Sequence, residues 1–337
     1  MNAHALASAD TLDAVIAALP AGLPTAEKDL LERFTRGFYE RLPQDELEAR
    51  EPADWAAIAR SFLGFTGQRA PGAPKIAVFN PTQAADGFDS SHTVVRIAND
   101  DMPFLVDSVR MALAQFGATL HQIAHPVMRV SRDAAGQLQG LGEGAAESLM
   151  YLEIDRQADA EAMAAIEAAL RAALGDVREA VSDWEVMREK MLRIADEFDT
   201  RPMPVDGASR LEAQAFLRWA ADNHFTFLGY REYEVTADRQ LAAVNGSGLG
   251  LMRGKDHLVQ PRPITGLAAA DLAPGATLDA LILTKTNARA TVHRPGYMDY
   301  IGVLVFDESG RAVREQRFLG LYTSSAYNRR PWEIPLV

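Results

Sequence analysis

Apolar residues recur every three or four positions along the first 70 residues, the spacing that one face of an α-helix produces. The positions are Leu30, Leu31, Phe34, Phe38 and Leu42, followed by Trp55, Ile58 and Phe62. Thr25 is placed to cap the first of these helices. Two glycines and two prolines between Gly67 and Pro74 then interrupt the spacing. The pattern predicts a helical N-terminal segment over residues 1–72.

Short β-rich runs alternate with helical spacing after residue 74. The extended runs are Lys75–Asn80, Thr93–Ala98, Thr119–Arg132 and Ser148–Ile154, and Pro126 should interrupt the third. A helix beginning near Leu105 should stop at Gly117, and a second should cover Ala160–Leu174. The glycines between Gly136 and Gly144 indicate a turn or a flexible loop.

The resulting order is β-α-β-β-α, and Val177–Val181 fits either a final strand or more helix. This order is that of the split βαβ, or ferredoxin-like, arrangement. We predict such a βαββαβ module over residues 75–198, including a trailing helix. That helix is marked by Trp184, Met187, Met191, Ile194 and Phe198.

A third region, residues 209–337, begins with one helix and continues mainly as strands. Ser209 and Glu212 have the spacing of a capping box. The strand-like runs are Phe225–Val235, Leu281–Thr284, Ala290–His293, Tyr300–Phe306 and Arg314–Tyr322, with a hairpin turn at Asp307–Gly310. The apolar residues Trp332, Ile334 and Leu336 suit an interior segment, so we expect this module to be truncated at its C-terminus. The predicted fold class is α+β, with an antiparallel β-rich second module.

The net charge, the absence of cysteine and the lack of a long apolar run exclude several classes of function. The formal charge is 34 minus 46, or -12, so the chain should repel nucleic acid and anionic membranes. The absence of cysteine excludes disulfides and thiolate metal sites and favours the cytoplasm. No apolar run reaches the roughly 18 residues of a membrane span. We expect a cytoplasmic protein.

Two motifs have simple interpretations. Gly246–Gly250 has GxGxG spacing but no helical pattern after it, so a glycine turn is favoured over a dinucleotide loop. His121 and His125 would lie about 13 Å apart on one strand, at roughly 3.3 Å per residue. One metal ion cannot bridge that distance, so no metal site is predicted. No hydrolase, metalloprotease or kinase motif is present, and the residues alone indicate neither a catalytic nor a cofactor-binding site.

One strand-to-helix loop carries candidate binding residues. They are Asn99, Asp100, Asp101, Met102, Pro103 and Phe104. The simpler interpretation is an N-cap, because Asn and Asp commonly begin helices. The functional interpretation is a pocket for a small amphoteric ligand, in which carboxylates bind an ammonium group and backbone N–H groups bind a carboxylate.

A second candidate is a basic and aromatic patch in this otherwise acidic chain. It comprises Lys285, Arg289, His293, Arg294, Tyr297 and Asp299. A solvated strand face paired with nearby acids is the simpler interpretation. The alternative is a surface that docks onto an acidic neighbouring domain or binds an anion.

Four runs resemble the N-terminal region of the large class of bacterial NAD-dependent glutamate dehydrogenases. They are residues 99–109 (NDDMPFLVDSV), 219–230 (WAADNHFTFLGY), 293–300 (HRPGYMDY) and 318–323 (FLGLYT). The resemblance extends from about Ala59 to the last residue. It implies an ACT-like module at residues 75–198 and a PAS-like β-rich module at 209–337.

The resemblance also implies that the catalytic site of the parent oxidoreductase lies outside this region. The parent would convert glutamate to 2-oxoglutarate and ammonia in amino acid catabolism, and its NAD and glutamate sites would lie downstream. This fragment would then have no cofactor and no activity. Its expected partners are the downstream domains of its own chain and further copies of itself in a homo-oligomer.

One residue departs from the pattern of ligand-binding ACT modules. Many of them carry Asp-x-Pro-Gly in the first strand-helix loop, whereas Phe104 follows Asp101-Met-Pro103 here. Phe104 is therefore expected in the helix core or at a subunit contact. A regulatory and assembly role is the first hypothesis, and an amino-acid sensor that controls subunit association is the alternative.

Overall fold

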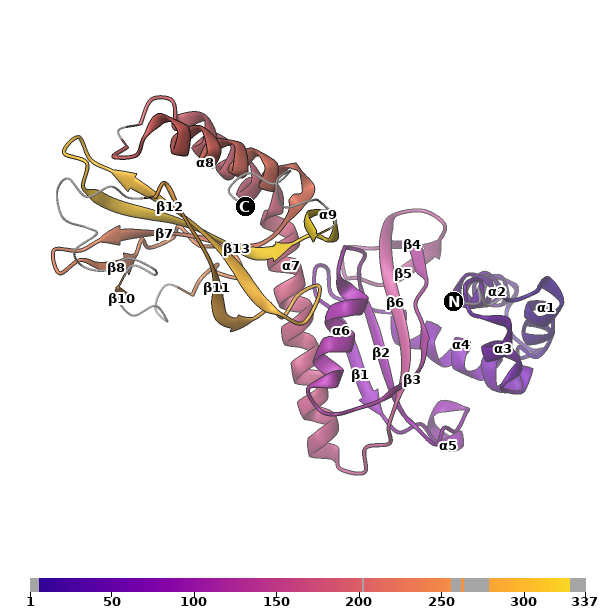
Figure 1. Ribbon diagram of the computed structural model, residues 1–337. Helices are drawn as coiled ribbons and strands as arrows, with labels where there is room; N and C mark the ends of the chain where they lie inside the picture. Colours follow the sequence, from indigo (N-terminus) through magenta and orange to yellow (C-terminus); the bar gives the residue numbers. More distant parts are fainter. Residues whose placement is uncertain (1–5, 202, 256–261, 264–278, 328–337) are drawn as a thin grey trace. The chain divides into compact units, whose positions relative to one another are not determined.

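The computed structural model describes residues 6–201, 203–255, 262–263 and 279–327, and the chain divides into two compact units (Figure 1). The first unit is Met1–Leu174 and the second is Gly175–Val337. Each contains one antiparallel sheet. No helix among the described residues is long and apolar enough to cross a membrane. The predicted interior segment at Trp332–Leu336 lies outside the described residues.

The first unit begins with the predicted helices. They are α1 (Ala9–Ala17), α2 (Thr25–Tyr39), α3 (Gln44–Glu48) and α4 (Pro52–Thr66). The predicted cap was wrong by one residue, because Thr25 is the first residue of α2 and Pro24 occupies the cap position. Proline fixes the extended backbone that precedes a helix, so it can begin one without a side-chain cap.

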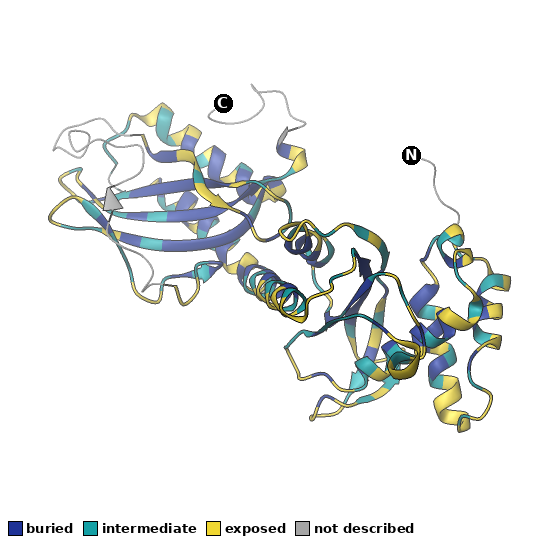
Figure 2. Ribbon diagram, turned by 90° about the horizontal axis from the view of Figure 1, so that it is seen from below, coloured by how far each residue is buried: buried dark blue, intermediate teal, exposed yellow. Residues whose placement is uncertain are grey.

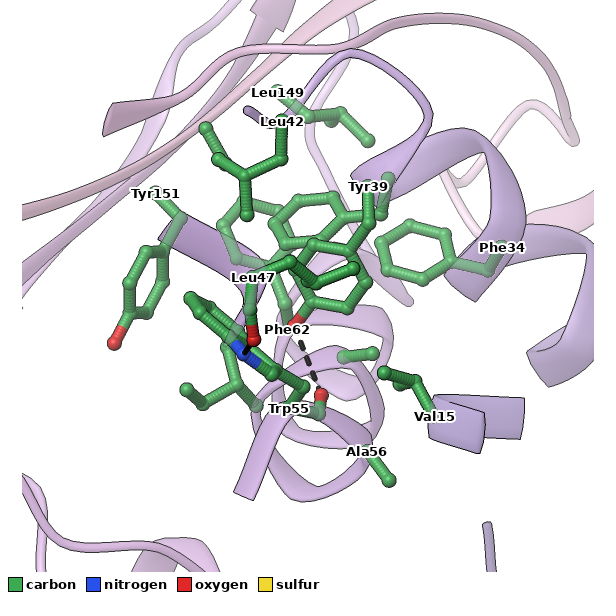
Figure 3. Packing of buried hydrophobic residues seen from close by; sticks show 14 of the residues in the cluster. Val15, Phe34, Tyr39, Leu42, Leu47, Trp55, Ala56, Phe62, Leu149 and Tyr151 are labelled. Carbon is green, nitrogen blue, oxygen red and sulfur yellow. Dashed lines mark hydrogen bonds between the residues drawn. The ribbon is translucent and has the colours of Figure 1, made fainter. Parts of the chain in front are cut away.

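Aromatic side chains form the core between these helices and the sheet. The Phe62 ring lies 4.8 Å from that of Phe38, centroid to centroid, and is fully buried. Polar atoms in this core are satisfied locally: the Tyr39 hydroxyl donates to Trp55 O at 2.8 Å, and Trp55 Nε1 donates to Leu47 O at 2.7 Å (Figure 3). Leu149 and Tyr151 of the sheet belong to the same cluster, so the N-terminal helices share their core with the sheet.

The first sheet contains six strands. They are β1 (Lys75–Phe79), β2 (Thr93–Asp100), β3 (Leu120–Ala124), β4 (Val127–Arg132), β5 (Leu138–Leu141) and β6 (Ala145–Ile154). Their order is β1-β2-β6-β4-β5, and β3 also pairs with β6. As predicted, the extended run is interrupted at Pro126, which lies between β3 and β4. The glycine-rich segment 136–144 was expected as a turn or loop, but it contains β5, which pairs with β4.

Helices complete the unit. The short α5 (Gln83–Asp86) and α6 (Leu105–Ala114) follow β1 and β2, and α7 (Ala160–Glu197) follows β6. The alternative left open at Val177–Val181 is resolved as helix, because the buried positions continue at helical spacing through Leu170, Leu174 and Val177. The edge of the sheet beside β2 is occupied by β1 instead. The α+β class with two sheets is confirmed.

The described residues of the second unit form one sheet of seven strands. Helix α8 (Gly207–Trp219) and a π-helical turn (Ala220–His224) precede β7 (Phe225–Val235), β8 (Gln240–Ala243), β9 (Leu249–Gly250), β10 (Arg262–Pro263), β11 (Leu281–Arg289), β12 (Tyr297–Phe306), β13 (Ala312–Tyr322) and α9 (Ser324–Tyr327). The order is β10-β8-β7-β13-β12-β11, and β9 pairs with β7. The long strands are largely buried (Figure 2).

The core of this unit joins the sheet to α8 and to the part of α7 beyond residue 175. Met187, Met191 and Phe216 from the helices pack with Phe227 and Phe318 from the strands. The hairpin predicted at Asp307–Gly310 is present, closed by a 2.9 Å bond from Asp307 N to Arg311 O.

Two local predictions in this region were wrong. The cap of α8 is Asp206, three residues before the predicted Ser209, because Asp206 accepts hydrogen bonds from the backbone N–H groups of Ala208 and Ser209, both at 2.9 Å. The expected strand Ala290–His293 is instead the connection between β11 and β12. His293 has a positive φ of 76° there, which extended backbone does not allow.

Replacing Phe62 by Ala should destabilise the first unit by about 3–5 kcal/mol, because a large ring would be lost from a closely packed core. Phe116→Ala is the matched control, since Phe116 is 42% exposed, and it should cost far less. Urea unfolding followed by circular dichroism measures both changes. Equal costs for the two variants would contradict the packing described here.

Candidate functional site

The loop 99–104 connects the end of β2 to the start of α6. Asp101 N donates to Ala146 O of β6 at 3.0 Å, which holds the loop beside the sheet. The predicted Asn or Asp cap was wrong: the cap position of α6 is Phe104, and within the described residues no side chain accepts a capping hydrogen bond there. The polar side chains lie too early in the loop, since β2 extends to Asp100.

Phe104 adopts the left-handed conformation that glycine favours. Its φ and ψ are 72° and 2°, a region that costs an L-residue roughly 1–2 kcal/mol. Its carbonyl accepts the first helical hydrogen bond, from Ser108 N at 3.0 Å, and its side chain is half-buried. The backbone therefore has a glycine-like conformation, although a bulky ring occupies the position.

Asp100 belongs to a buried ionic network. Arg69 Nη2 lies 2.6 Å from Asp100 Oδ1 and 2.8 Å from Glu147 Oε1. Arg132 binds the same Glu147 through Nε at 2.6 Å and Nη2 at 2.9 Å. The side chains of Arg69 and Glu147 are only 4% and 2% exposed. Two arginines and two carboxylates thus neutralise one another beneath the loop.

The network shifts the pKa values of Glu147 and Arg69. Burial alone would raise the pKa of Glu147, but hydrogen bonds from Arg132 and Arg69 outweigh it and hold the pKa below its ordinary value of 4.5. Burial alone would lower the pKa of Arg69, but hydrogen bonds to Glu147 and Asp100 raise it. The charged forms of Glu147 and Arg69 are therefore both favoured by their contact.

The other residues of the loop differ in accessibility. Asn99 is buried, and its Nδ2 donates to Asp100 O at 3.0 Å. Met102 is half-buried, whereas Asp101 and Pro103 are exposed. Of the three polar residues predicted to face a ligand, Asp101 is exposed, the side chain of Asp100 is 33% exposed, and Asn99 is buried.

The two histidines, His121 and His125, make separate polar contacts. His121 Nε2 lies 2.6 Å from Asp155 Oδ1, and this hydrogen bond lowers the pKa of Asp155 to about 2. His125 Nε2 lies 2.6 Å from Ser148 Oγ, and burial lowers the pKa of His125. Within the described ranges, no three acidic or histidine side chains are grouped so as to hold a metal ion.

The glycine run Gly246–Gly250 forms a turn that leads into β9, as predicted. Gly250 N donates to the buried carboxylate of Asp183 at 2.7 Å. A carboxylate of the chain itself therefore binds the N–H group that a dinucleotide loop would present to phosphate.

The residues of the basic patch make several separate local contacts. Lys285 Nζ lies 2.5 Å from Asp299 Oδ1, and Asp299 Oδ2 also accepts from Tyr322 N at 3.1 Å. Arg294 donates to Tyr322 O at 2.8 Å. Arg289 lies over the Tyr297 ring, 5.2 Å from its centroid. His293 is half-buried in the connecting loop.

The sequence did not reveal the buried ionic network that binds Asp100 of loop 99–104. Arg69 and Arg132 come from a connecting segment and a strand, and they meet Glu147 only in the fold. A second missed cluster lies on β7 and β13, where Arg231, Glu315 and Arg317 are fully buried. The available signal was a charged residue at alternate positions inside an apolar strand, which marks a buried polar group or a polar face.

Comparison with known families identifies the first unit. Residues 34–170 match the family described as "Glutamate dehydrogenase, ACT1 domain". The matched region is therefore similar to an ACT1 domain of that family, and it includes the helices α4 and α6, the first sheet and the start of α7.

Proteins similar to nearly the whole chain are also glutamate dehydrogenases. This chain is 36% identical over 318 residues to the NAD-specific glutamate dehydrogenase of Halomonas elongata, covering 91% of this chain and 20% of that protein. The corresponding values for the Pseudomonas aeruginosa enzyme are 35% over 320 residues, covering 90% and 19%. The Mycobacterium tuberculosis enzyme is 28% identical over 334 residues, covering 93% and 19%. The resemblance to NAD-specific glutamate dehydrogenases is confirmed, and the chain spans about a fifth of the length of these relatives.

Among solved structures, an RNA-binding light-oxygen-voltage receptor covers 91% of this chain and 88% of its own, at 12% identity. Its TM-score of 0.15 is too low to bear on the fold.

Glu147→Gln should destabilise the first unit by about 3–5 kcal/mol, because two buried guanidinium groups would lose their shared carboxylate. Glu143→Gln, at an exposed position nearby, should change stability by less than about 0.5 kcal/mol. Chemical unfolding at neutral pH measures the difference. A small effect of Glu147→Gln would show that the network is not held as described.

Acid should weaken the same network. Because the pKa of Glu147 is lowered in the folded chain, its stabilisation is complete above its unfolded value, near 4.5, and is lost as pH falls through the folded value. The free energy of unfolding should therefore fall on acidification below about pH 4.5, and less steeply in Glu147→Gln. Identical slopes in the two proteins would contradict the assignment.

Proposed function

We propose that this chain is the N-terminal regulatory and assembly region of a large NAD-dependent glutamate dehydrogenase, and that it is not itself catalytic. The observation that carries the proposal is the extent of the similarity. About nine-tenths of this chain matches NAD-specific glutamate dehydrogenases, yet the match covers only a fifth of them. An ACT1 domain within that match supports a regulatory role.

The parent would oxidise L-glutamate with NAD and water to 2-oxoglutarate, ammonia and NADH, as an enzyme of amino acid catabolism in the cytoplasm. Its NAD and glutamate sites would lie in downstream domains, which are the proposed partners of this chain. We propose three functional segments: helices at 1–72, the ACT-like module at 75–198 and a PAS-like β-rich module at 209–337. Homo-oligomerisation is part of this proposal.

An assembly role is favoured over ligand sensing at the loop 99–104. Arg69 binds Asp100, the side chain of Asn99 is buried, and Phe104 occupies the position of the usual glycine. A ligand there would have to compete with the ionic network.

The alternative is an amino-acid sensor, in which loop 99–104 binds an effector and controls subunit association. The specific observation in its favour is the left-handed backbone of Phe104, which keeps the glycine-like loop shape. Asp101 is exposed within that loop and could bind an ammonium group.

A direct assay tests the non-catalytic role. The purified chain, supplied with glutamate and NAD, should produce no NADH above the rate without protein, because the proposed catalytic domains are downstream. The full-length parent under the same conditions is the positive control. Steady turnover by the isolated chain, followed by NADH absorbance, would refute the proposal.

The docking role of the basic patch is tested by charge reversal. Arg289→Glu should weaken assembly of the full-length parent, because Arg289 is exposed and faces only the Tyr297 ring in the contact described. Arg193→Glu, also at an exposed position, is the control and should leave assembly unchanged. Sedimentation velocity measures the oligomer. Equal behaviour of the two variants would exclude this patch as the docking surface.

A further inference from the structure

The second sheet has a buried polar face formed by neighbouring strands. In the antiparallel register of β7 and β13, Arg231 lies opposite Arg317 and Tyr233 lies opposite Glu315. Residues two apart on a strand project to the same face, so all four share one face. Each is at most 1% exposed. Charged groups are seldom buried so completely unless they are paired or bind something.

Arg317 is held rigidly within this face. Its guanidinium lies over the rings of Tyr233 and Tyr300, 4.0 and 4.6 Å from their centroids. Its Nε donates to Glu315 Oε1 at 2.9 Å, and the Tyr300 hydroxyl donates to the same oxygen. Gly302 makes room for this arrangement, because a Cβ there would lie 2.8 Å from Tyr300 Cε1.

The contact between Arg317 and Glu315 leaves hydrogen-bonding groups on both residues. Nη1 and Nη2 of Arg317 and Oε2 of Glu315 are buried without a hydrogen-bond partner in the part of the chain that the structure describes. Guanidinium and carboxylate commonly meet through two parallel hydrogen bonds. Here they meet through one, so two donor groups of Arg317 and one acceptor oxygen of Glu315 remain.

These groups have a defined chemical complement. The planar edge formed by Nη1 and Nη2 matches a carboxylate, which accepts two parallel hydrogen bonds. Oε2 of Glu315 needs a donor, and an ammonium group supplies a stronger, charge-assisted hydrogen bond than a neutral hydroxyl does. A 2-oxo acid supplies the carboxylate but no donor, and phosphate would be repelled by Glu315.

We propose that this face of the β-rich module binds a free α-amino acid, with its carboxylate on Arg317 and its ammonium group on Glu315. The rings of Tyr233 and Tyr300 fix the guanidinium for that contact. The site is distinct from loop 99–104, and the proposal does not depend on the parent activity proposed above.

Thermal unfolding of the 337-residue chain tests the proposal against the twenty common amino acids and 2-oxoglutarate. One or a few amino acids should raise Tm saturably, by roughly 5–10 °C at about 100 times Kd. The matching N-acetyl derivative and the carboxamide should both fail, because each lacks one of the two charged groups. These analogues test the wild-type chain, so the result does not depend on a variant folding.

Matched variants then locate the site. Arg317→Lys should weaken binding by roughly tenfold or more, because lysine keeps the charge but cannot form the two-donor edge. Arg314→Lys, on the same strand at a more exposed position, should bind as the wild type does. Calorimetric titration measures both affinities, and circular dichroism confirms that each variant is folded.

Three results would overturn the proposal. If no compound tested raised Tm, the buried groups would be hydrogen-bonded to water only. Equal binding by an amino acid and its 2-oxo acid would exclude the role of Glu315. Binding that survives Arg317→Lys but is abolished by Asp101→Asn would place the site at loop 99–104. None of these results bears on whether the chain catalyses glutamate oxidation, which the NADH assay decides.

Discussion

Buried charge is the constraint on which both sheets depend. A charged side chain inside a protein is stable only when an opposite charge and hydrogen bonds replace its water. In the first sheet, Glu147 meets this requirement through Arg69 and Arg132, and the same network fixes Asp100 at the start of loop 99–104. In the second sheet, Glu315 meets it only in part through Arg317. The first arrangement holds a loop against the sheet, whereas the second leaves polar atoms of Arg317 and Glu315 without a hydrogen-bond partner in the described part of the chain.

Hydrophobic spacing was enough to predict the main elements. The helical N-terminus, the strand break at Pro126 and the long strand Phe225–Val235 all follow from local pattern. Helix ends were harder to place, because several polar residues near a helix compete for the cap. Asp206 caps α8 in preference to Ser209, and Phe104 precedes α6 in a conformation that its residue type disfavours. Those choices depend on tertiary contacts that local propensity does not contain.

The candidate sites were predictable only in part. The sequence pointed to loop 99–104 because polar residues gather where a strand becomes a helix. The sequence could not reveal that Arg69 would form an ion pair with Asp100, because the two residues are 31 positions apart in the chain. The same limit applies to Arg317 and Tyr233, which meet through strand register. Alternating charge within an aromatic strand was the available signal, and it identifies a polar face without identifying its partners.

In the function proposed here, these modules regulate or assemble a dehydrogenase whose chemistry takes place elsewhere in its chain. The most direct test is to compare the full-length parent with a version lacking the region equivalent to this chain. Steady-state kinetics and sedimentation would be measured on both. We expect glutamate oxidation with NAD to persist per folded catalytic domain, while the oligomeric state or the response to effectors changes. Loss of NAD binding by a folded, truncated enzyme, with assembly and regulation unchanged, would contradict it.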